Sequence, residues 1–124
     1  MVKKYRKGYM GEREMVHLLY SKGYMAIRTP RSGRICLPSP DVIAAKNGRL
    51  IVIECKFRED AFKISEDQLK ELEEWKMKAR AEAYIAWKIS RRGWSFLRLE
   101  DVINNNGNVN KSFAEKFSFG IDSL

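Results

Sequence analysis

The sequence of residues 40–56, PDVIAAKNGRLIVIECK, decides how the centre of this chain folds. Two runs rich in apolar and β-branched residues flank Asn47-Gly48, the dipeptide most typical of a two-residue β-hairpin turn. A turn of this length fixes the register of its strands, and here the register places Asp41 directly across from Glu54. Opposite residues of an antiparallel pair have Cβ atoms about 4.5–5.5 Å apart. The sequence therefore predicts two adjacent carboxylates at the open end of the hairpin.

Alternation along the two strands predicts that Lys56 lies on the same face as Asp41 and Glu54. Two facing carboxylates repel each other unless something intervenes. A divalent cation is one solution, because oxygen ligands at this spacing suit Mg²⁺ or Mn²⁺. A shared proton or a nearby arginine is the structural alternative. Lys56 would then orient a water or counter the charge on a phosphate, or else form an ordinary ion pair with Glu54.

The rest of the chain alternates between helical and strand patterns. The order α-β-β-β-α-β-β indicates an α/β fold with a mixed sheet flanked by helices. Residues 101–124 are expected to form a peripheral tail with a short helix. The expected helices are 10–22 and 65–81, the latter opening with a capping box, and the expected strands are 24–29, 41–46, 49–57, 83–89 and 94–99.

Length and composition narrow the class of protein. A chain of 124 residues, 44% hydrophobic and 32% charged, is typical of one globular domain. No apolar run is long enough to predict a membrane span. Two cysteines are too few for a disulfide framework, so a cytoplasmic location is expected. The single histidine, His17, excludes a histidine-rich zinc site.

Positive charge is concentrated at the start of the chain. The formal net charge is +8, and residues 1–34 hold nine basic residues against two acidic ones. Such a cluster favours a polyanionic partner, with nucleic-acid phosphate as the leading candidate. The alternative is a charge excess that serves only solubility.

Four further residues have a structural interpretation, and for Glu12 and Cys55 a functional one stands beside it. Glu12, in the first turn of the expected helix, is either favoured by the helix macrodipole or a third carboxylate facing the metal. Ser32 is a loop serine, and Gln68 is explained as part of a helix cap. Cys55 alternates to the opposite face from Glu54, which favours core packing, although its main-chain carbonyl could reach the metal.

Together, Glu12, Pro40-Asp41 and Glu54-Cys55-Lys56 resemble the PD…(D/E)xK pattern of metal-dependent nucleases. Within that superfamily the chain resembles the archaeal Holliday junction resolvases, over about residues 5–100. The other matching segments are Lys7-Gly8, Arg13, Arg28, Ser32-Gly33, Val42-Ile43-Ala44, Gln68 and Tyr84-Ile85-Ala86.

The resemblance implies a restriction-endonuclease-like fold in a single nuclease domain over residues 1–124. It implies a two-fold homodimer that cuts branched DNA, the four-way junction, with Mg²⁺, for which Mn²⁺ is a candidate substitute. It implies metal ligation by Glu12, Asp41 and Glu54. Ser32 and Lys56 would complete the catalytic set. Contacts to DNA are expected from Arg6, Lys7, Arg13, Arg28, Arg31 and Arg34.

Two alternatives stay open from the residues themselves. One is a related nuclease that acts on flap, nicked or duplex DNA. The other is a non-catalytic DNA-binding module, which the intact set of carboxylates and lysine argues against. Phosphodiester hydrolysis needs an activated water and stabilisation of charge at phosphorus, and a carboxylate-held metal with one lysine supplies both without a histidine.

Overall fold

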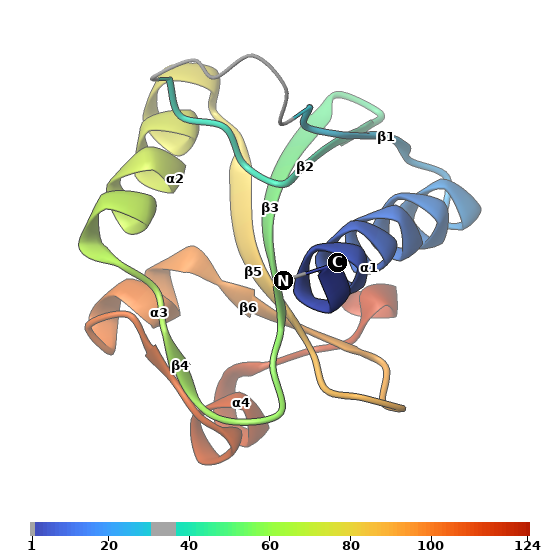
Figure 1. The fold of residues 1–124 in the computed structure, drawn as a ribbon. Coiled ribbons are helices and arrows are strands. Elements are labelled where there is room, and N and C mark those ends of the chain that lie inside the picture. The colour runs from blue at the N-terminus through green and yellow to red at the C-terminus, as the bar shows by residue number, and fades with distance from the viewer. Residues whose placement is uncertain (1, 31–36) are drawn as a thin grey trace.

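The computed structural model describes residues 2–30 and 37–124, with side chains described from Met10 onward in the first segment. A five-stranded mixed sheet runs through the centre, in the order β1-β2-β3-β5-β6, with helices on both faces (Figure 1). The elements are α1 (Val2–Ser21), β1 (Met25–Arg28), β2 (Val42–Lys46), β3 (Arg49–Phe57), β4 (Phe62–Lys63), α2 (Glu66–Ala79), β5 (Glu82–Lys88), β6 (Trp94–Arg98), α3 (Leu99–Asn104), β7 (Asn108–Val109), α4 (Lys111–Phe117) and the 3₁₀ helix η1 (Ile121–Ser123).

The central hairpin of β2 and β3 forms as the sequence predicts. Asn47 and Gly48 both have positive φ, 48° and 82°, as a two-residue type I′ turn requires. The pairs Ala45↔Leu50 and Ile43↔Val52 confirm the expected register. Because β2 begins at residue 42, Asp41 lies just beyond the last pair, at the open end of the hairpin.

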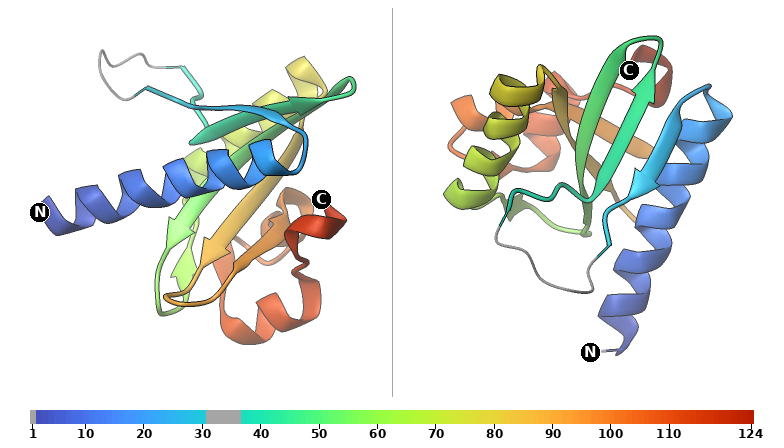
Figure 2. Two further views of the ribbon diagram at one scale, coloured as in Figure 1. Left: turned by 90° about the vertical axis from the view of Figure 1, so that its right-hand side faces the viewer. Right: turned by 90° about the horizontal axis from the view of Figure 1, so that it is seen from above.

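The sheet separates two hydrophobic cores, because β3 and β5 are covered on both faces. Val52, Ile85 and Leu97 face a core shared with α2, α3 and α4. Ile51, Ile53 and Ala86 face a second core shared with α1 and the last residues of the chain. Figure 2 shows α1 on one side of the sheet and α2 on the other. This arrangement places the two acids of the hairpin on the side of α2.

Helix α1 begins at Val2, eight residues earlier than the sequence predicts. The prediction was wrong because Gly8 and Gly11 weaken the helical pattern in this part of the chain. Gly11 has a packing role: a Cβ at this position would lie 1.7 Å from the Phe57 ring. Glu12 therefore sits in the interior of a long helix, where the macrodipole interpretation no longer applies.

Helix α2 begins with the cap that the sequence predicts. The Ser65 hydroxyl accepts a hydrogen bond from the Gln68 main-chain N–H, at 3.2 Å. The Gln68 side chain does not complete a capping box, and its amide donates to Glu54 instead. The interpretation of Gln68 as a cap is thus right for its main chain and wrong for its side chain.

The segment after residue 100 is packed more tightly than the expected peripheral tail. Val102, Val109 and Ala114 are buried in the same core as α2. The predicted short helix is α4, and β7 pairs with β4 in a separate two-stranded sheet. Single apolar residues in an Asn-rich stretch show no periodicity, so their burial could not be predicted. Among the residues that the structure describes, no helix is long and apolar enough to cross a membrane.

Candidate functional site

Three carboxylates are buried near the open end of the hairpin. Glu12, Asp41 and Glu54 are 6%, 5% and 9% exposed, and within residues 10–30 and 37–124 no other charged or polar residue is as deeply buried. Removing an ionised carboxylate from water is costly unless it is paired or bound to a cation. The residues predicted as metal ligands are therefore the described carboxylates that most need partners or a cation in the folded chain.

Asp41 and Glu54 are held in place by neighbouring donors. An Asp41 oxygen, Oδ2, accepts a hydrogen bond from the Cys55 main-chain N–H at 2.8 Å, which ties Asp41 to β3. Glu54 Oε2 accepts from the Gln68 side-chain amide at 3.0 Å and lies 4.0 Å from Lys56 Nζ. Both partners of the Lys56–Glu54 pair are largely buried, with side chains 22% and 11% exposed. The pair is therefore not an ordinary surface ion pair.

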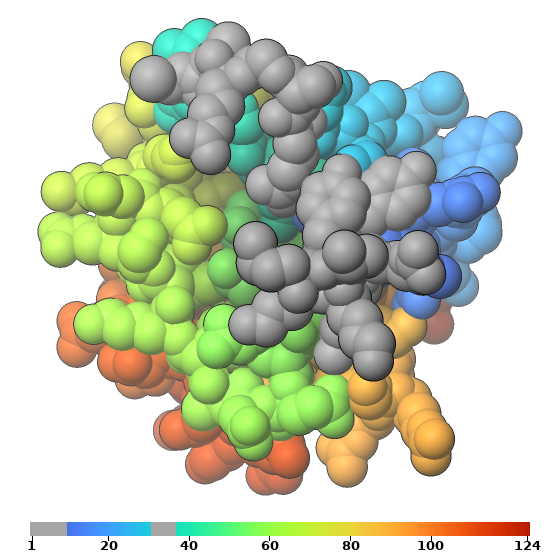
Figure 3. All heavy atoms as spheres, viewed as in Figure 1, coloured from blue at the N-terminus to red at the C-terminus, as the bar shows by residue number. Residues whose placement is uncertain are grey.

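The two acids border a small pocket of about 80 Å³ under α2. Gln68, Glu71, Leu72 and Trp75 form its wall on the inner side of that helix. Figure 3 shows a hollow between the yellow-green atoms of α2 and the green atoms of the β3 region. The hollow is on the scale of an ion with its water shell rather than of an organic cofactor.

Glu71 is a pocket residue that the sequence did not single out, whereas Gln68 was named as a helix cap and as one of the residues that carry the family resemblance. Their i, i+3 spacing places both on one helix face, which is the only sequence signal that Glu71 carries. That signal is useful only once α2 is known to pack beside the open end of the hairpin. Its packing against β3 and β5 is a tertiary fact.

Glu12 has a different environment. Its Oε1 accepts from Arg28 Nε at 3.2 Å, across the gap between α1 and the end of β1. In the described part of the chain, no three His, Cys, Asp or Glu residues form a group that could hold one ion. Asp41 and Glu54 line the same pocket, and carboxylate oxygens are the ligands that a hard cation prefers. Glu12 as a third ligand stays a prediction.

The charges of the three acids affect the pKa of the neighbouring Cys55 thiol. Its thiol is buried on the opposite face of β3 from Glu54, as predicted for a packing residue. Burial raises the pKa of Cys55 well above its ordinary value, and Asp41, Glu54 and Glu12 raise it further. All three carboxylates therefore act on one point of the strand, and the thiol is protonated at neutral pH.

Most of the predicted DNA-contacting residues are not described at side-chain level. Arg13 is exposed on α1, and Arg28 ends β1 beside Glu12. The side chains of Arg6 and Lys7, and all of Ser32, Arg31 and Arg34, lie outside the described residues. Their roles stay predictions.

Comparison with known proteins gives consistent matches along almost the whole chain. Residues 3–122 match the model of the family described as archaeal Holliday junction resolvase (Hjc). The crossover junction endodeoxyribonuclease Hjc of Sulfolobus acidocaldarius is 33% identical over 119 residues, covering 94% of this chain and 82% of that protein. The protein of the same name from Archaeoglobus fulgidus is 33% identical over 95 residues, covering 76% and 70%.

A solved structure agrees with these matches. The structure of Archaeoglobus fulgidus Hjc, a Holliday junction resolvase from an archaeal hyperthermophile, superposes with a TM-score of 0.81 and 27% sequence identity. The match covers 90% of this chain and 94% of that one. The expected restriction-endonuclease-like α/β fold is thereby confirmed.

Proposed function

We propose that this chain, which belongs to the archaeal Holliday junction resolvase family, is a metal-dependent endonuclease that resolves four-way DNA junctions by paired symmetric nicks. The observation that supports this most strongly is the burial of Glu12, Asp41 and Glu54 in a domain of 124 residues. Three buried carboxylates do not help a small domain to fold, because each must be taken out of water. A metal-dependent nuclease would use them to hold its ion. Junction-cutting relatives that span most of the chain supply the substrate class.

The donor set fits Mg²⁺, with Mn²⁺ as a candidate substitute. Asp41 and Glu54 would hold the ion through carboxylate oxygens, with Glu12 as the third acid of the set. A bound divalent ion would lower the pKa of a water and stabilise charge on the phosphate.

The surrounding residues would prepare this site. The Cys55 N–H fixes Asp41, and Gln68 fixes Glu54, so both carboxylates are oriented before substrate binds. Lys56 lies beside Glu54 with part of its side chain open to solvent. From there its ammonium group would contact a phosphate oxygen or hold the attacking water.

The basic first quarter of the chain would hold the DNA. Arg13 is exposed on the same helix as Glu12, so a phosphate bound by Arg13 would lie close to the acids. Arg28, held by Glu12, would position the helix against the end of β1. Contacts of this kind read the shape and charge of a junction rather than its bases.

A homodimer would give two sites to the two cut strands, since a two-fold assembly matches a two-fold junction. An apolar sheet face offers a surface for it. Met25 and Ile27 on the edge strand β1 are 70% and 61% exposed. Their cross-strand neighbours on this face include Ile43, which is only partly buried.

Replacing Ile27 with Asp should convert a dimer to a monomer in light scattering, whereas an unchanged mass would exclude this face.

The test is a cleavage assay on a synthetic four-way junction, with flap and linear duplex as controls, in Mg²⁺ and in EDTA. The proposal expects paired nicks on the junction alone, lost in EDTA. Cutting of flap or duplex instead would keep the metal site and replace the substrate. Tight junction binding without nicks in Mg²⁺ or Mn²⁺ would point to a binding module and contradict the proposal.

A further inference from the structure

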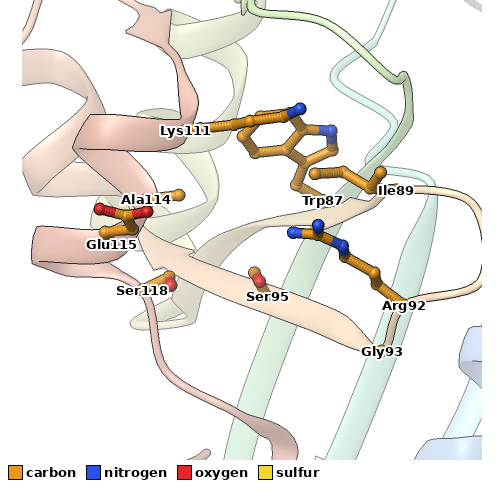
Figure 4. Close-up of a pocket in the computed structure, with 9 residues that line it drawn as sticks. All are labelled: Trp87, Ile89, Arg92, Gly93, Ser95, Lys111, Ala114, Glu115 and Ser118. Atoms are coloured by element: carbon orange, nitrogen blue, oxygen red, sulfur yellow. The ribbon is translucent and has the colours of Figure 1, made fainter.

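A second hollow lies away from the acids, between the β5–β6 turn and α4 (Figure 4). Its volume is about 160 Å³, twice that of the pocket beside Asp41. Figure 4 shows Arg92 and Lys111 extending toward Trp87 from opposite sides, with Ser95 and Ser118 on the adjoining wall. The β5–β6 turn, β6 and α4 with its C-cap therefore each contribute a cation or a hydroxyl group to the lining of the hollow.

The polar groups of this hollow are not used by the fold. Arg92 and Lys111 form no side-chain hydrogen bond or ion pair with other described residues, and the hydroxyls of Ser95 and Ser118 form none either. The lining also contains one acid, Glu115, which leaves an excess of one positive charge. Two cations beside two hydroxyl donors are the groups that bind a phosphate.

The walls of the hollow are held in place by packing and hydrogen bonds. Trp87 is 2% exposed, and its indole N–H donates to the Arg58 carbonyl at 2.7 Å. Its ring packs edge-on against Phe62, with centroids 5.1 Å apart. The turn that carries Arg92 is closed by a hydrogen bond from its N–H to the Ile89 carbonyl at 3.0 Å. A ligand would therefore meet a preformed wall rather than having to order one.

The hollow and the candidate active site lie along one row of paired residues in the central sheet. Lys56 pairs with Trp87 on β5, and Trp87 pairs with Ser95 on β6, so the three residues form one row across neighbouring strands. Two strand spacings are about 10 Å. Each strand of duplex DNA carries one phosphate per 3.4 Å or so of helix axis, so a strand placed at Lys56 has other phosphates within reach of the hollow.

We infer that the hollow lined by Arg92, Lys111, Ser95 and Ser118 binds a backbone phosphate of the DNA arm that leaves the active site. This inference rests on the proposed function for its ligand, DNA. Its chemistry is a charge-assisted contact to a phosphodiester without base recognition. It gives the C-terminal segment, which carries no catalytic motif, a part in holding the substrate.

The test compares two double variants with the same loss of charge. Arg92→Ala with Lys111→Ala removes both cations of the hollow. The matched control is Lys63→Ala with Lys70→Ala, two lysines of a different hollow that also holds Glu66 and Glu73. All four changed side chains are exposed, so both variants should fold.

The first double variant should bind the four-way junction roughly 10-fold more weakly, and its salt dependence should fall by about one to two phosphate contacts. The control should change affinity by less than about 2-fold, because Lys70 pairs with Glu66 at 3.4 Å and the two acids of this hollow balance its two lysines. In single-turnover assays with enzyme in excess, both variants should cut bound junction at the wild-type rate. Glu115→Gln should have the opposite effect and tighten binding.

Equal affinity of the two double variants, or no response to Glu115→Gln, would overturn the inference. A change in the single-turnover rate alone would also overturn it, because the hollow would then act on chemistry rather than on binding. Titration with inorganic phosphate separates the other source of the same chemistry. Loss of phosphate binding with full junction affinity would assign the hollow to a free phosphate and not to DNA. If the wild type binds DNA but cuts no junction, the proposed function fails while the affinity comparison still decides this inference.

Discussion

The acids of the hairpin and the acid of the first helix reach similar burial by different routes. Asp41 and Glu54 lie where the two-residue turn at Asn47-Gly48 places them, each six residues from the turn along its strand. Glu12 is buried because α1 packs closely on β3, at a point where Gly11 leaves room for the Phe57 ring. The first position follows from local geometry, and the second from an approach between segments distant in the sequence.

The hairpin acids and Glu12 also differ in the groups that contact them. The hairpin acids are held by Cys55 N–H and Gln68 and face the pocket under α2. Glu12 is held by Arg28, a cation that already offsets its charge. We therefore expect the hairpin pair to dominate metal binding and Glu12 to contribute less, and the following variants test that ranking.

The largest effect is expected from replacing a hairpin acid with its amide. Asp41→Asn or Glu54→Gln keeps the shape and removes the charge that a cation needs. Because a bound metal contributes several kcal/mol to the transition state, single-turnover cleavage should fall by about 10³-fold or more. Junction binding, measured by gel shift in Ca²⁺ or EDTA, should stay within a few-fold of wild type. Cleavage at the wild-type rate would remove that residue from the mechanism.

Glu12→Gln is expected to have an intermediate effect. The change weakens the contact to Arg28 and removes one negative charge near the site, but it leaves the hairpin pair intact. Cleavage should fall by about 10- to 100-fold, less than for either hairpin acid. Raising the Mg²⁺ concentration should recover more of the activity of Glu12→Gln than of Asp41→Asn. A loss as large as that of Asp41→Asn would contradict the ranking and make Glu12 an equal ligand.

Gln68→Ala should have a smaller effect, because it removes only the hydrogen bond that orients Glu54. A positioning contact of this kind is worth about one kcal/mol, so cleavage should fall by roughly 5-fold. The required Mg²⁺ concentration should rise, which a change in stability alone would not cause. Gln68→Glu is the sharper partner variant, since it brings a further negative charge beside Glu54 without removing volume. Unchanged Mg²⁺ dependence in both variants would show that Gln68 acts only as part of the helix.

The smallest change to the site, and a test of how α1 is positioned, is Gly11→Ala. The added methyl must displace the Phe57 ring, and overpacking of this kind costs about 1–3 kcal/mol. Better helix propensity offsets up to about 1 kcal/mol of that cost. Urea unfolding should therefore show a modest net loss of stability, which Phe57→Leu should partly restore. A gain in stability would mean that α1 does not need the close approach.

Local rules were sufficient for the hairpin, the cap of α2 and the placement of Asp41 and Glu54, because turn chemistry and alternation act over a few residues. They were not sufficient for the start of α1, since two glycines obscure a helix that packing stabilises. They also missed the side chain of Gln68, because a capping pattern and a contact to Glu54 give the same residue at the same position.

The C-terminal segment shows the same limit. Val102, Val109 and Ala114 become core residues through the pairing of β4 with β7 and the packing of α4, none of which has a periodic signal. The hollow beside Arg92 and Lys111 exists only because that packing brings α4 to the β5–β6 turn. Sequence patterns predicted which residues are candidates for the chemistry, and tertiary packing decided what surrounds them.

The most direct test of the central claim, that the buried acids are kept for a metal, is thermal unfolding of the wild type and of Asp41→Asn with and without Mg²⁺. Without metal, Asp41→Asn should be at least as stable as the wild type, because it removes a buried charge next to Glu54. Saturating Mg²⁺ should raise the melting temperature of the wild type by a few degrees and leave that of the variant nearly unchanged. Equal shifts in the two proteins, or a large loss of stability in metal-free Asp41→Asn, would show that Asp41 serves the fold and contradict the account.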